Sequence, residues 1–352
     1  MRLLILGGTR FLGRHVVDAA VARGHRVTTF TRGNEPTHID PAVVPLGGNR
    51  DPAIAPGLAP LATGEWDAVI DTSGYVPRIV GASAELLADR VSRYVFVSSM
   101  SVYASADRPG LDETAPRAVL DDPATEAVPT HYGALKAACE DAVGSRLGTR
   151  ATIVRPGLIV GPFDPTDRFA YWVARFIQPA LLGDRPDEAV VPAPPERPLQ
   201  FIDARDLGVW LVGLAERDTP GTFNAASERG HFTWGGLVDA LIAVARERGF
   251  AGPRGIPVPR WLDDATLVAH QVSPWTGLPL WLPASEADHA GFLEFDCRRA
   301  HAAGLAERAL EDTIRDTADW LAERPNDGAW RLALTAGSER AILGSILGSG
   351  RI

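Results

Sequence analysis

Apolar runs of strand length alternate with segments of helical periodicity along the first half of the chain. The runs contain few charged residues, as expected for strands that are buried on both faces of a parallel sheet. They occupy residues 2–6, 25–30, 42–46, 67–71, 93–99 and 151–156. Residues 11–24, 77–90 and 131–148 lie between them and carry apolar side chains three or four positions apart. This alternation predicts an α/β fold with a doubly wound parallel sheet.

The second half of the chain is irregular and rich in proline, and 352 residues exceed a typical single domain. Residues 199–227 again resemble strand, helix and strand, so we expect the chain to return to the first domain there. The predicted division is a first domain of residues 1–160 with 199–227, and a smaller, mostly helical lobe of residues 161–198 and 228–352.

Composition excludes several classes of protein. A formal net charge of -9 opposes a surface that follows phosphates, so we expect no nucleic-acid partner. Cys139 and Cys297 are too few for a disulfide framework or a cysteine-based zinc site, and such sparse use fits a reducing cytoplasm. No apolar run approaches the length of a membrane span. We therefore expect a cytoplasmic protein with no metal and no membrane contact.

A glycine-rich turn follows the first predicted strand, in the sequence GGTRFLGRH at residues 7–15. Glycine lets the backbone turn tightly and approach phosphates, and the N–H groups at the start of the next helix face negative charge. A structural turn is the alternative, but the position after the first strand favours a Rossmann-type dinucleotide site. The residues expected to contact the cofactor there are Gly7, Thr9, Arg10, Phe11, Leu12 and Gly13.

The end of the second predicted strand discriminates between the two nicotinamide cofactors. NAD usually requires an acidic residue there for the ribose 2′-hydroxyl, whereas the 2′-phosphate of NADP requires positive charge. The chain reads TFTRGN at this point, with Arg32 and no acid. Arg32 and Arg10 together favour NADP over NAD, because guanidinium groups form charge-assisted hydrogen bonds with phosphate. The alternative is that Arg32 is an ordinary solvated arginine.

Four motifs occur in an order and spacing that resemble one large superfamily. They are GGTRFLG (7–13), VFVSSMSVY (95–103), YGALK (132–136) and VRPGLIVGP (154–162). With QFIDARD (200–206), they resemble the extended short-chain dehydrogenase/reductase superfamily, also called the NAD-dependent epimerase/dehydratase family. The form of the first motif, with Arg10, is similar to a less typical branch that includes chloroplast stem-loop RNA-binding proteins and bacterial reductases.

The resemblance implies a catalytic triad of Ser99, Tyr132 and Lys136. Tyr132 and Lys136 are one helical turn apart, so they share a helix face. A phenol with a pKa near ~10 relays protons poorly at neutral pH unless a cation stabilises its phenolate. Lys136 is the only lysine of the chain, and a compact ammonium suits both this role and hydrogen bonds to the cofactor ribose. Ser99 would hold the carbonyl or hydroxyl oxygen of the substrate.

The resemblance also implies further contacts. The remaining cofactor-binding residues expected from it are Asn49, Arg50, Thr72, Ser73, Gly74 and Pro156. Candidate substrate residues are Tyr75, Tyr103, Asp167, Arg168 and Trp172, although aromatic residues are more often core than pocket. Residues 104–130 interrupt the pattern and are interpreted as a surface loop or as a lid beside the site. Related enzymes pair through two helices, here 77–90 and 131–148, so we expect a homodimer.

Departures from the family pattern restrict the reaction. Dehydratases carry an Asp–Glu pair after the hydroxyl residue, where this chain has Met100 and Ser101. The asparagine that contacts a sugar-nucleotide diphosphate is replaced by Leu158, and the arginine expected before Phe201 is absent. We therefore predict an NADP-dependent oxidoreductase of the carbonyl reductase or alcohol dehydrogenase type, acting on a small molecule. The alternatives are a sugar epimerase that retains its cofactor and a cofactor-sensing RNA-binding protein.

Overall fold

A computed structural model describes residues 1–33, 40–249, 255–324 and 330–349. The chain forms two compact units. Unit 1 contains residues 1–159, 202–228 and 295–307, and unit 2 contains 160–201, 229–294 and the chain from 308 onward.

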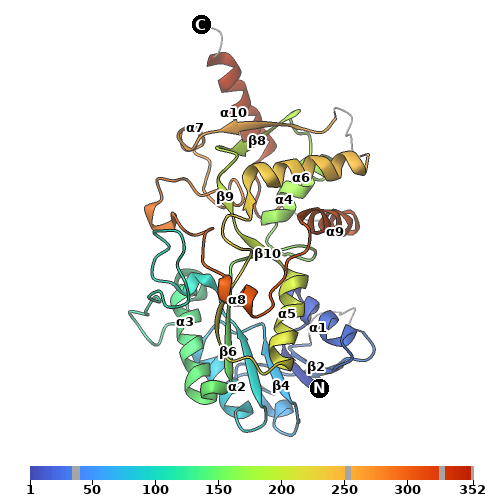
Figure 1. The fold of residues 1–352 in the computed structure, drawn as a ribbon, viewed down its shortest axis with the longest axis vertical. Coiled ribbons are helices and arrows are strands. Elements are labelled where there is room, and N and C mark those ends of the chain that lie inside the picture. Colours follow the sequence, from blue (N-terminus) through green and yellow to red (C-terminus); the bar gives the residue numbers. More distant parts are fainter. Residues whose placement is uncertain (34–39, 250–254, 325–329, 350–352) are drawn as a thin grey trace. The chain divides into compact units, whose positions relative to one another are not determined.

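Unit 1 is built on a seven-stranded parallel sheet with the strand order β11-β6-β5-β4-β1-β2-β3 (Figure 1). The sheet contains β1 (Arg2–Leu6), β2 (Arg26–Thr31), β3 (Val44–Gly47), β4 (Ala68–Asp71), β5 (Arg93–Val97), β6 (Ala151–Pro156) and β11 (Gly221–Ala225). Its helices are α1 (Phe11–Ala22), α2 (Pro77–Leu87), α3 (Val128–Leu147), α5 (Ala204–Glu216) and α8 (Arg298–Ala302). Short 3-10 turns are η1 (Ala59–Leu61), η2 (Met100–Val102) and η3 (Gly148–Arg150). The predicted doubly wound α/β fold is confirmed.

Both faces of this sheet are covered, which explains why its strands are apolar at consecutive positions. Leu3 and Ile5 of β1 belong to a core cluster with side chains of α1 and α5. Leu4 and Leu6 point to the other face and join a cluster with side chains of α2 and α3. The view in Figure 1 places α2 and α3 on one side of the strands and α1 and α5 on the other.

The segment of residues 295–307 belongs to unit 1, whereas the sequence-based division assigned it to the second lobe. Ala300 of α8 and Leu305 are buried in the core cluster shared by α1 and α5. The carbonyl oxygen of Ala226 lies 3.0 Å from Nε2 of His301, and Trp210 donates to the Ala303 carbonyl at 3.1 Å. Tertiary packing of this kind leaves no periodic signal in so short a helix.

Unit 2 is mostly helical. It contains α4 (Arg168–Ile177), α6 (Trp234–Glu247), α7 (Asp264–Ala269), α9 (Leu310–Glu323), α10 (Ala336–Ser349), η4 (Pro179–Leu182) and η5 (Ala287–His289). Two small sheets pair β8 (Glu188–Pro192) with β13 (Val258–Leu262) and β9 (Pro198–Leu199) with β12 (Phe232–Thr233). The chain passes between the units near β7 (Leu158–Val160) and β10 (Phe201–Asp203).

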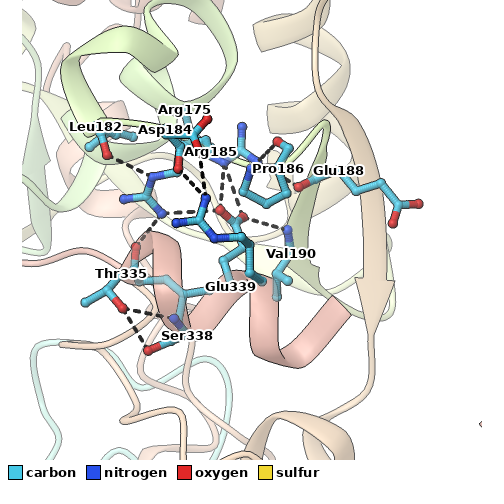
Figure 2. A network of polar contacts seen from close by, with 12 residues as sticks. Arg175, Leu182, Asp184, Arg185, Pro186, Glu188, Val190, Thr335, Ser338 and Glu339 are labelled. Carbon is cyan, nitrogen blue, oxygen red and sulfur yellow. Dashed lines mark hydrogen bonds and ion pairs between the residues drawn. The ribbon is translucent and has the colours of Figure 1, made fainter. Parts of the chain in front are cut away.

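A buried charged network fastens the last helix of unit 2 (Figure 2). Glu339 of α10 is fully buried, and its carboxylate accepts from Arg175 of α4 and from Arg185, each at 3.2 Å. It also accepts from the backbone N–H of Val190 in β8 at 3.1 Å. One carboxylate therefore joins α10, α4 and β8, and the opposite charges compensate for its removal from water.

Candidate active site

The turn after β1 has the close backbone approach that a dinucleotide site requires. Gly7 has φ 108°, and a Cβ built on it would lie 2.6 Å from Oγ1 of Thr72. A Cβ on Gly13 in α1 would lie 2.7 Å from the backbone nitrogen of Gly8. Arg10 is the N-cap of α1, and its side chain caps no backbone N–H of the first turn. This uncapped helix start beside a glycine cradle fits a pyrophosphate.

The turn after β4 lies against the glycine turn. The Leu6 carbonyl at the end of β1 accepts from the hydroxyls of Thr72 at 3.1 Å and Ser73 at 3.0 Å. Gly74 is buried, and a Cβ there would lie 2.6 Å from the ring of Phe96. The three residues expected at the cofactor thus form one tight turn at the carboxyl edge of the sheet. Because Gly74 has no side chain, a ligand that passes this position would contact backbone atoms only.

Other predicted cofactor residues also stand at this edge. Arg32 is exposed directly after β2, and β2 runs parallel to β1 with Phe30 opposite Leu6. Pro156 ends β6, opposite Ala225 of β11. The side chains of Thr9 and Phe11 are half-buried, and Leu12 is buried in the core against the sheet.

Asn49 and Arg50 follow β3, and the structure directs both side chains to protein partners. The Asn49 amide oxygen accepts from the backbone N–H of Asp51 at 3.0 Å. Arg50 turns inward and donates to both carboxylate oxygens of Asp71, at 2.6 and 2.7 Å. Arg50 therefore supports the site from behind the turn of residues 72–74.

Lys136 is buried in the first half of α3, with 3% of its surface exposed. Its ammonium donates to the carbonyl oxygens of Gly74 at 2.7 Å and Val97 at 2.6 Å, so it joins the turn after β4 to the end of β5. It also lies 4.4 Å from the centre of the Phe96 ring and 5.4 Å from that of Tyr75. Burial lowers the pKa of Lys136 from its ordinary value near 10.5 to about 8.

Tyr132 begins the regular part of α3, because His131 before it has the non-helical angles φ -125° and ψ 25°. The Tyr132 ring is half-buried, and its centre lies 6.4 Å from that of Tyr75. Gly133 brings α3 against η2, since a Cβ at this position would lie 2.0 Å from the Ser101 carbonyl oxygen. The sequence singled out the YGALK motif without showing this need for glycine.

Ser99 follows β5 and caps η2, and its hydroxyl accepts from the backbone N–H of Ser101 at 3.1 Å. Val97, two residues earlier, is a carbonyl partner of Lys136. Ser99, Tyr132 and Lys136 are therefore brought to the same edge of the sheet by the contacts of β5, η2 and α3. Tyr75 is 47% exposed beside them, as a residue in contact with a ligand would need to be.

Tyr103 does not point toward this cluster but into a buried polar network. Its hydroxyl donates to Asn224 of β11 at 2.5 Å and accepts from Arg155 at 3.0 Å. Burial raises the pKa of Tyr103 to about 12. Arg155 also makes two bonds to Glu140, one turn beyond Lys136 on α3, at 2.7 and 2.9 Å. These partners give Tyr103 a structural environment within unit 1.

The segment that the sequence interprets as a loop or a lid is fastened along its first half. Ala104 donates to the Pro116 carbonyl at 2.9 Å, and Ala118 donates to that of Val102 at 2.7 Å. The Glu113 carboxylate accepts from the backbone N–H of Asn224 in β11 at 2.7 Å. Because β11 is the edge strand of the sheet, this segment also completes its hydrogen bonding. The surface-loop interpretation is favoured for residues 104–118.

Three candidate substrate residues lie in unit 2. Asp167 is fully buried, and its carboxylate pairs with Arg324 at 2.5 Å and accepts from the backbone N–H of Arg331 at 2.9 Å. Trp172 is fully buried in α4 and donates to the Pro279 carbonyl at 3.0 Å. Arg168 is half-buried, with its guanidinium 5.8 Å from the ring centre of Trp275. The partners of Asp167 and Trp172 are those of structural residues.

No helix within residues 1–33, 40–249, 255–324 and 330–349 is long and apolar enough to cross a membrane. The same residues contain no group of three His, Cys, Asp or Glu side chains that would hold a metal ion.

Comparison with known proteins agrees with this architecture. A family model described as NAD dependent epimerase/dehydratase family matches residues 71–226. The chloroplast stem-loop binding protein of 41 kDa b of Arabidopsis thaliana is 27% identical over 272 residues, which cover 72% of this chain. The match covers 64% of that relative, so the chain spans less than two thirds of its length.

Solved structures show the same fold. A putative epimerase from Burkholderia cenocepacia has a TM-score of 0.66 and 22% identity, with 92% of this chain and 98% of that chain covered. The enzyme WbmH of Bordetella bronchiseptica, in complex with NAD+, has a TM-score of 0.65 and 16% identity, with the same coverage. Human epimerase family protein SDR39U1 (isoform 2), with NADPH, has a TM-score of 0.56 and 19% identity, covering 91% of this chain and 99% of that chain.

The parallel sheet, the glycine cradle after β1 and the helix with Tyr132 and Lys136 at the carboxyl edge form an arrangement that suits a dinucleotide site. Residues 71–226 thus match the NAD dependent epimerase/dehydratase family, and the fold of the chain is similar to that of solved epimerases.

Proposed function

We propose that the protein is an NADP-dependent oxidoreductase that interconverts a carbonyl and a hydroxyl group on a small molecule. The observation that carries this proposal is the placement of Lys136, the only lysine, between a carbonyl of the turn after β4 and the carbonyl that ends β5. A lysine with only a surface role would be exposed to solvent, whereas the Lys136 ammonium is enclosed. The ammonium has three donors, and two take up the carbonyls of Gly74 and Val97, which leaves one for a cofactor ribose hydroxyl.

The nicotinamide dinucleotide supplies or accepts a hydride when it is bound. Tyr132 exchanges the proton with the substrate oxygen, and the nearby positive charge of Lys136 favours its phenolate form. Ser99 donates its hydroxyl to the same substrate oxygen and orients it. Tyr75 lies beside Tyr132, where its ring can contact a bound substrate.

Arg10 and Arg32 support the choice of NADP. Both are exposed at the carboxyl edge beside the glycine cradle, Arg10 at the start of α1 and Arg32 after β2. The pair offers two guanidinium groups for one 2′-phosphate.

Leu158, Leu199 and Gln200 support a substrate without a nucleotide diphosphate. All three are buried and replace positions at which sugar-nucleotide enzymes of the superfamily donate to the diphosphate. A charged group that loses hydrogen bonds on transfer from water costs about 1–3 kcal/mol for each lost bond. A UDP-sugar would therefore bind weakly.

The epimerase alternative is favoured by the structural neighbours. The UDP-glucuronic acid 4-epimerase of Bacillus cereus, solved with NAD, has a TM-score of 0.61 and 14% identity to this chain. An epimerase returns the hydride to the same substrate and consumes no added cofactor, whereas a reductase oxidises NADPH in step with product.

The deciding experiment measures NADPH oxidation by the protein with a panel of small aldehydes and ketones, in parallel with UDP and UDP-glucose binding by calorimetry. We expect NADPH consumption with at least one carbonyl compound, its loss in Lys136→Arg, and no tight UDP-glucose binding. The exchange Arg146→Lys, at an exposed site on the same helix, is the matched control and should leave turnover intact. Low-micromolar UDP-glucose binding without NADPH consumption would restore the epimerase alternative.

We further propose a cytoplasmic homodimer that pairs through α2 and α3. Cys139 and Cys297 are buried and form no disulfide, which suits a reducing compartment. The two helices pack together, and the half-buried side chains of Ile79, Ala82 and Ala138 are small enough for a helical interface. Light scattering at micromolar concentration should report twice the mass of the chain, and a monomer would contradict the pairing.

A further inference from the structure

Asp71, at the end of β4, is the centre of a buried polar cluster behind the site. Its side chain is fully buried and receives both ends of the Arg50 guanidinium, at 2.6 and 2.7 Å. The Tyr94 hydroxyl of β5 donates to it at 2.8 Å. The backbone N–H of Ser73 donates to the same carboxylate at 3.1 Å. Arg50 further donates to the hydroxyl of Ser83 in α2 at 2.7 Å.

The surroundings of this cluster are apolar, which makes the charges costly. Leu6, Phe96 and Cys139 belong to the same core cluster as Tyr94. A buried ion pair often adds no stability over apolar side chains of similar volume, because its desolvation offsets the attraction. Stability alone therefore gives no reason for Arg50 and Asp71 to occupy this core.

The cluster is connected to Lys136 through the turn of residues 72–74. Asp71 holds the N–H of Ser73, and Arg50 reaches the Ser73 hydroxyl at 3.3 Å. The next residue, Gly74, presents its carbonyl to the Lys136 ammonium at 2.7 Å. The charged pair thus fixes the turn that carries one of the two carbonyl partners of Lys136.

We propose that Arg50 and Asp71 are positioning residues, which hold the turn of residues 72–74 so that Gly74 fixes the Lys136 ammonium and the backbone follows the cofactor. This inference rests on the proposed function in assigning Lys136 to the cofactor. The ion pair acts through the turn, and neither of its members touches the substrate.

The charges around Lys136 determine how its pKa should respond when Arg50 and Asp71 are replaced. The pKa of Lys136 is lowered first by burial, then raised by Cys139 and Asp71, lowered by Arg50 and raised by Glu140. Removing Arg50 and Asp71 together takes away two opposing influences. A remaining change in the titration of Lys136 then reports a change in its position and hydration.

The single lysine permits a direct measurement, because protein grown on lysine labelled with carbon-13 at Cε gives one lysine signal. The test variant is Arg50→Met/Asp71→Leu/Tyr94→Phe, which fills the cluster with apolar side chains. We expect the Lys136 titration midpoint to change by about one pH unit, because the ammonium is no longer held at the Gly74 carbonyl and its hydration changes. NADPH affinity, measured by calorimetry, should fall about tenfold because the turn beside the cofactor is no longer fixed.

Two variants serve as controls. Tyr94→Phe keeps the ion pair and should leave both readouts unchanged. Arg93→Met/Asp218→Asn removes another buried arginine and its carboxylate partner at the opposite end of β5, and it should also leave the Lys136 signal in place. If either control reproduces the shift, loosened packing rather than the positioned turn is responsible, and the proposal is overturned.

An unchanged midpoint and an unchanged NADPH affinity in a folded triple variant would equally overturn it. If the triple variant does not fold, Arg50→Gln decides, because glutamine stays polar but cannot bind both carboxylate oxygens. We expect it to move the Lys136 signal and weaken NADPH binding, and no change in either would reject the proposal. Failure of the unaltered protein to bind NADPH would refute the proposed function instead, while the Lys136 midpoints would still test the turn.

Discussion

At the scale of single residues, the proposed chemistry depends most on Lys136, the single lysine. The sequence places Lys136 one turn after Tyr132, and the structure surrounds its ammonium with two carbonyls and two aromatic rings. A planar guanidinium is wider and directs its donors in a fixed fork, so it does not suit this enclosure. The residue type is therefore determined by the space as well as by the charge.

Burial of Lys136 predicts a particular dependence of stability on pH. Its pKa is about 8 in the folded protein and near 10.5 in the unfolded chain, so between these values the unfolded chain binds more protons. The lysine contribution to the free energy of unfolding therefore rises with pH across this window, by about 3 kcal/mol in total. Urea unfolding from pH 7 to 10.5 gives the free energy of unfolding of the parent protein and of Lys136→Met. The difference between the two at each pH measures the lysine contribution. A constant difference would contradict the burial of the ammonium.

Arg32 carries the prediction about cofactor choice. Arg32→Asp places an anion where the 2′-phosphate is expected, so NADPH affinity should fall about tenfold or more while NADH affinity is retained or improved. Arg26→Asp, an exposed exchange at the opposite end of β2, is the control and should leave both affinities alone. Calorimetry that finds equal affinities for NADPH and NADH in the parent protein would reject the NADP preference.

At the level of single residues, the sequence was informative where a motif carries the chemistry. Spacing alone predicts that Tyr132 and Lys136 share a helix face. The inward direction of Arg50 and Tyr103 was not predictable, because the partners Asp71 and Asn224 are 21 and 121 residues away along the chain. Asp71 could have been noticed as an acidic residue that ends an otherwise apolar strand.

Among the elements, α3 is the one on which the site depends most. It carries Tyr132 and Lys136, and it reaches η2 through the close approach at Gly133. The periodicity of residues 131–148 predicted this helix, but the helix begins at Val128 with a kink at His131. Local sequence marks such a kink weakly, because Pro129 is also compatible with the first turn of an uninterrupted helix.

Gly133→Ala tests this approach. The added methyl group would lie 2.0 Å from the Ser101 carbonyl oxygen, so α3 and η2 must separate, and turnover should fall at least about tenfold. Gly144→Ala on the same helix is the matched control, since nothing lies within 4 Å of its added Cβ. It should stabilise the protein by about 0.5–1 kcal/mol and leave turnover intact. Equal activity of the two variants would show that the helix position is not critical.

At the scale of the whole molecule, alternation of strands and helices predicted the sheet of unit 1, because its central strands are buried on both faces. The return of the chain to this unit at residues 202–228 follows the same pattern, whereas residues 295–307 return with only the short helix α8. The arrangement of unit 2 was less predictable. Its short strands and buried ion pairs depend on partners far apart along the chain.

The buried network of Glu339 predicts that a substitution at this residue strongly destabilises unit 2. Glu339→Gln leaves the buried guanidinium groups of Arg175 and Arg185 without a counter-charge, so unfolding should cost about 3–5 kcal/mol less. Asp184→Asn is the control. Asp184 is exposed and pairs with Arg340, which lies next to Glu339 on α10. Its effect should stay below about 1 kcal/mol. Thermal and urea unfolding of both variants measure the difference, and similar small losses would mean that the Glu339 network contributes little.

The most direct test of the account is the response of the Lys136 signal to NADPH. The protein labelled only at its single lysine is titrated with NADPH while the carbon-13 resonance is followed. If the cofactor binds along the glycine turn and its ribose reaches the ammonium, the resonance should shift in step with binding and saturate at one NADPH per chain. Binding of NADPH that leaves the Lys136 resonance unmoved, or no binding at all, would contradict the site proposed here.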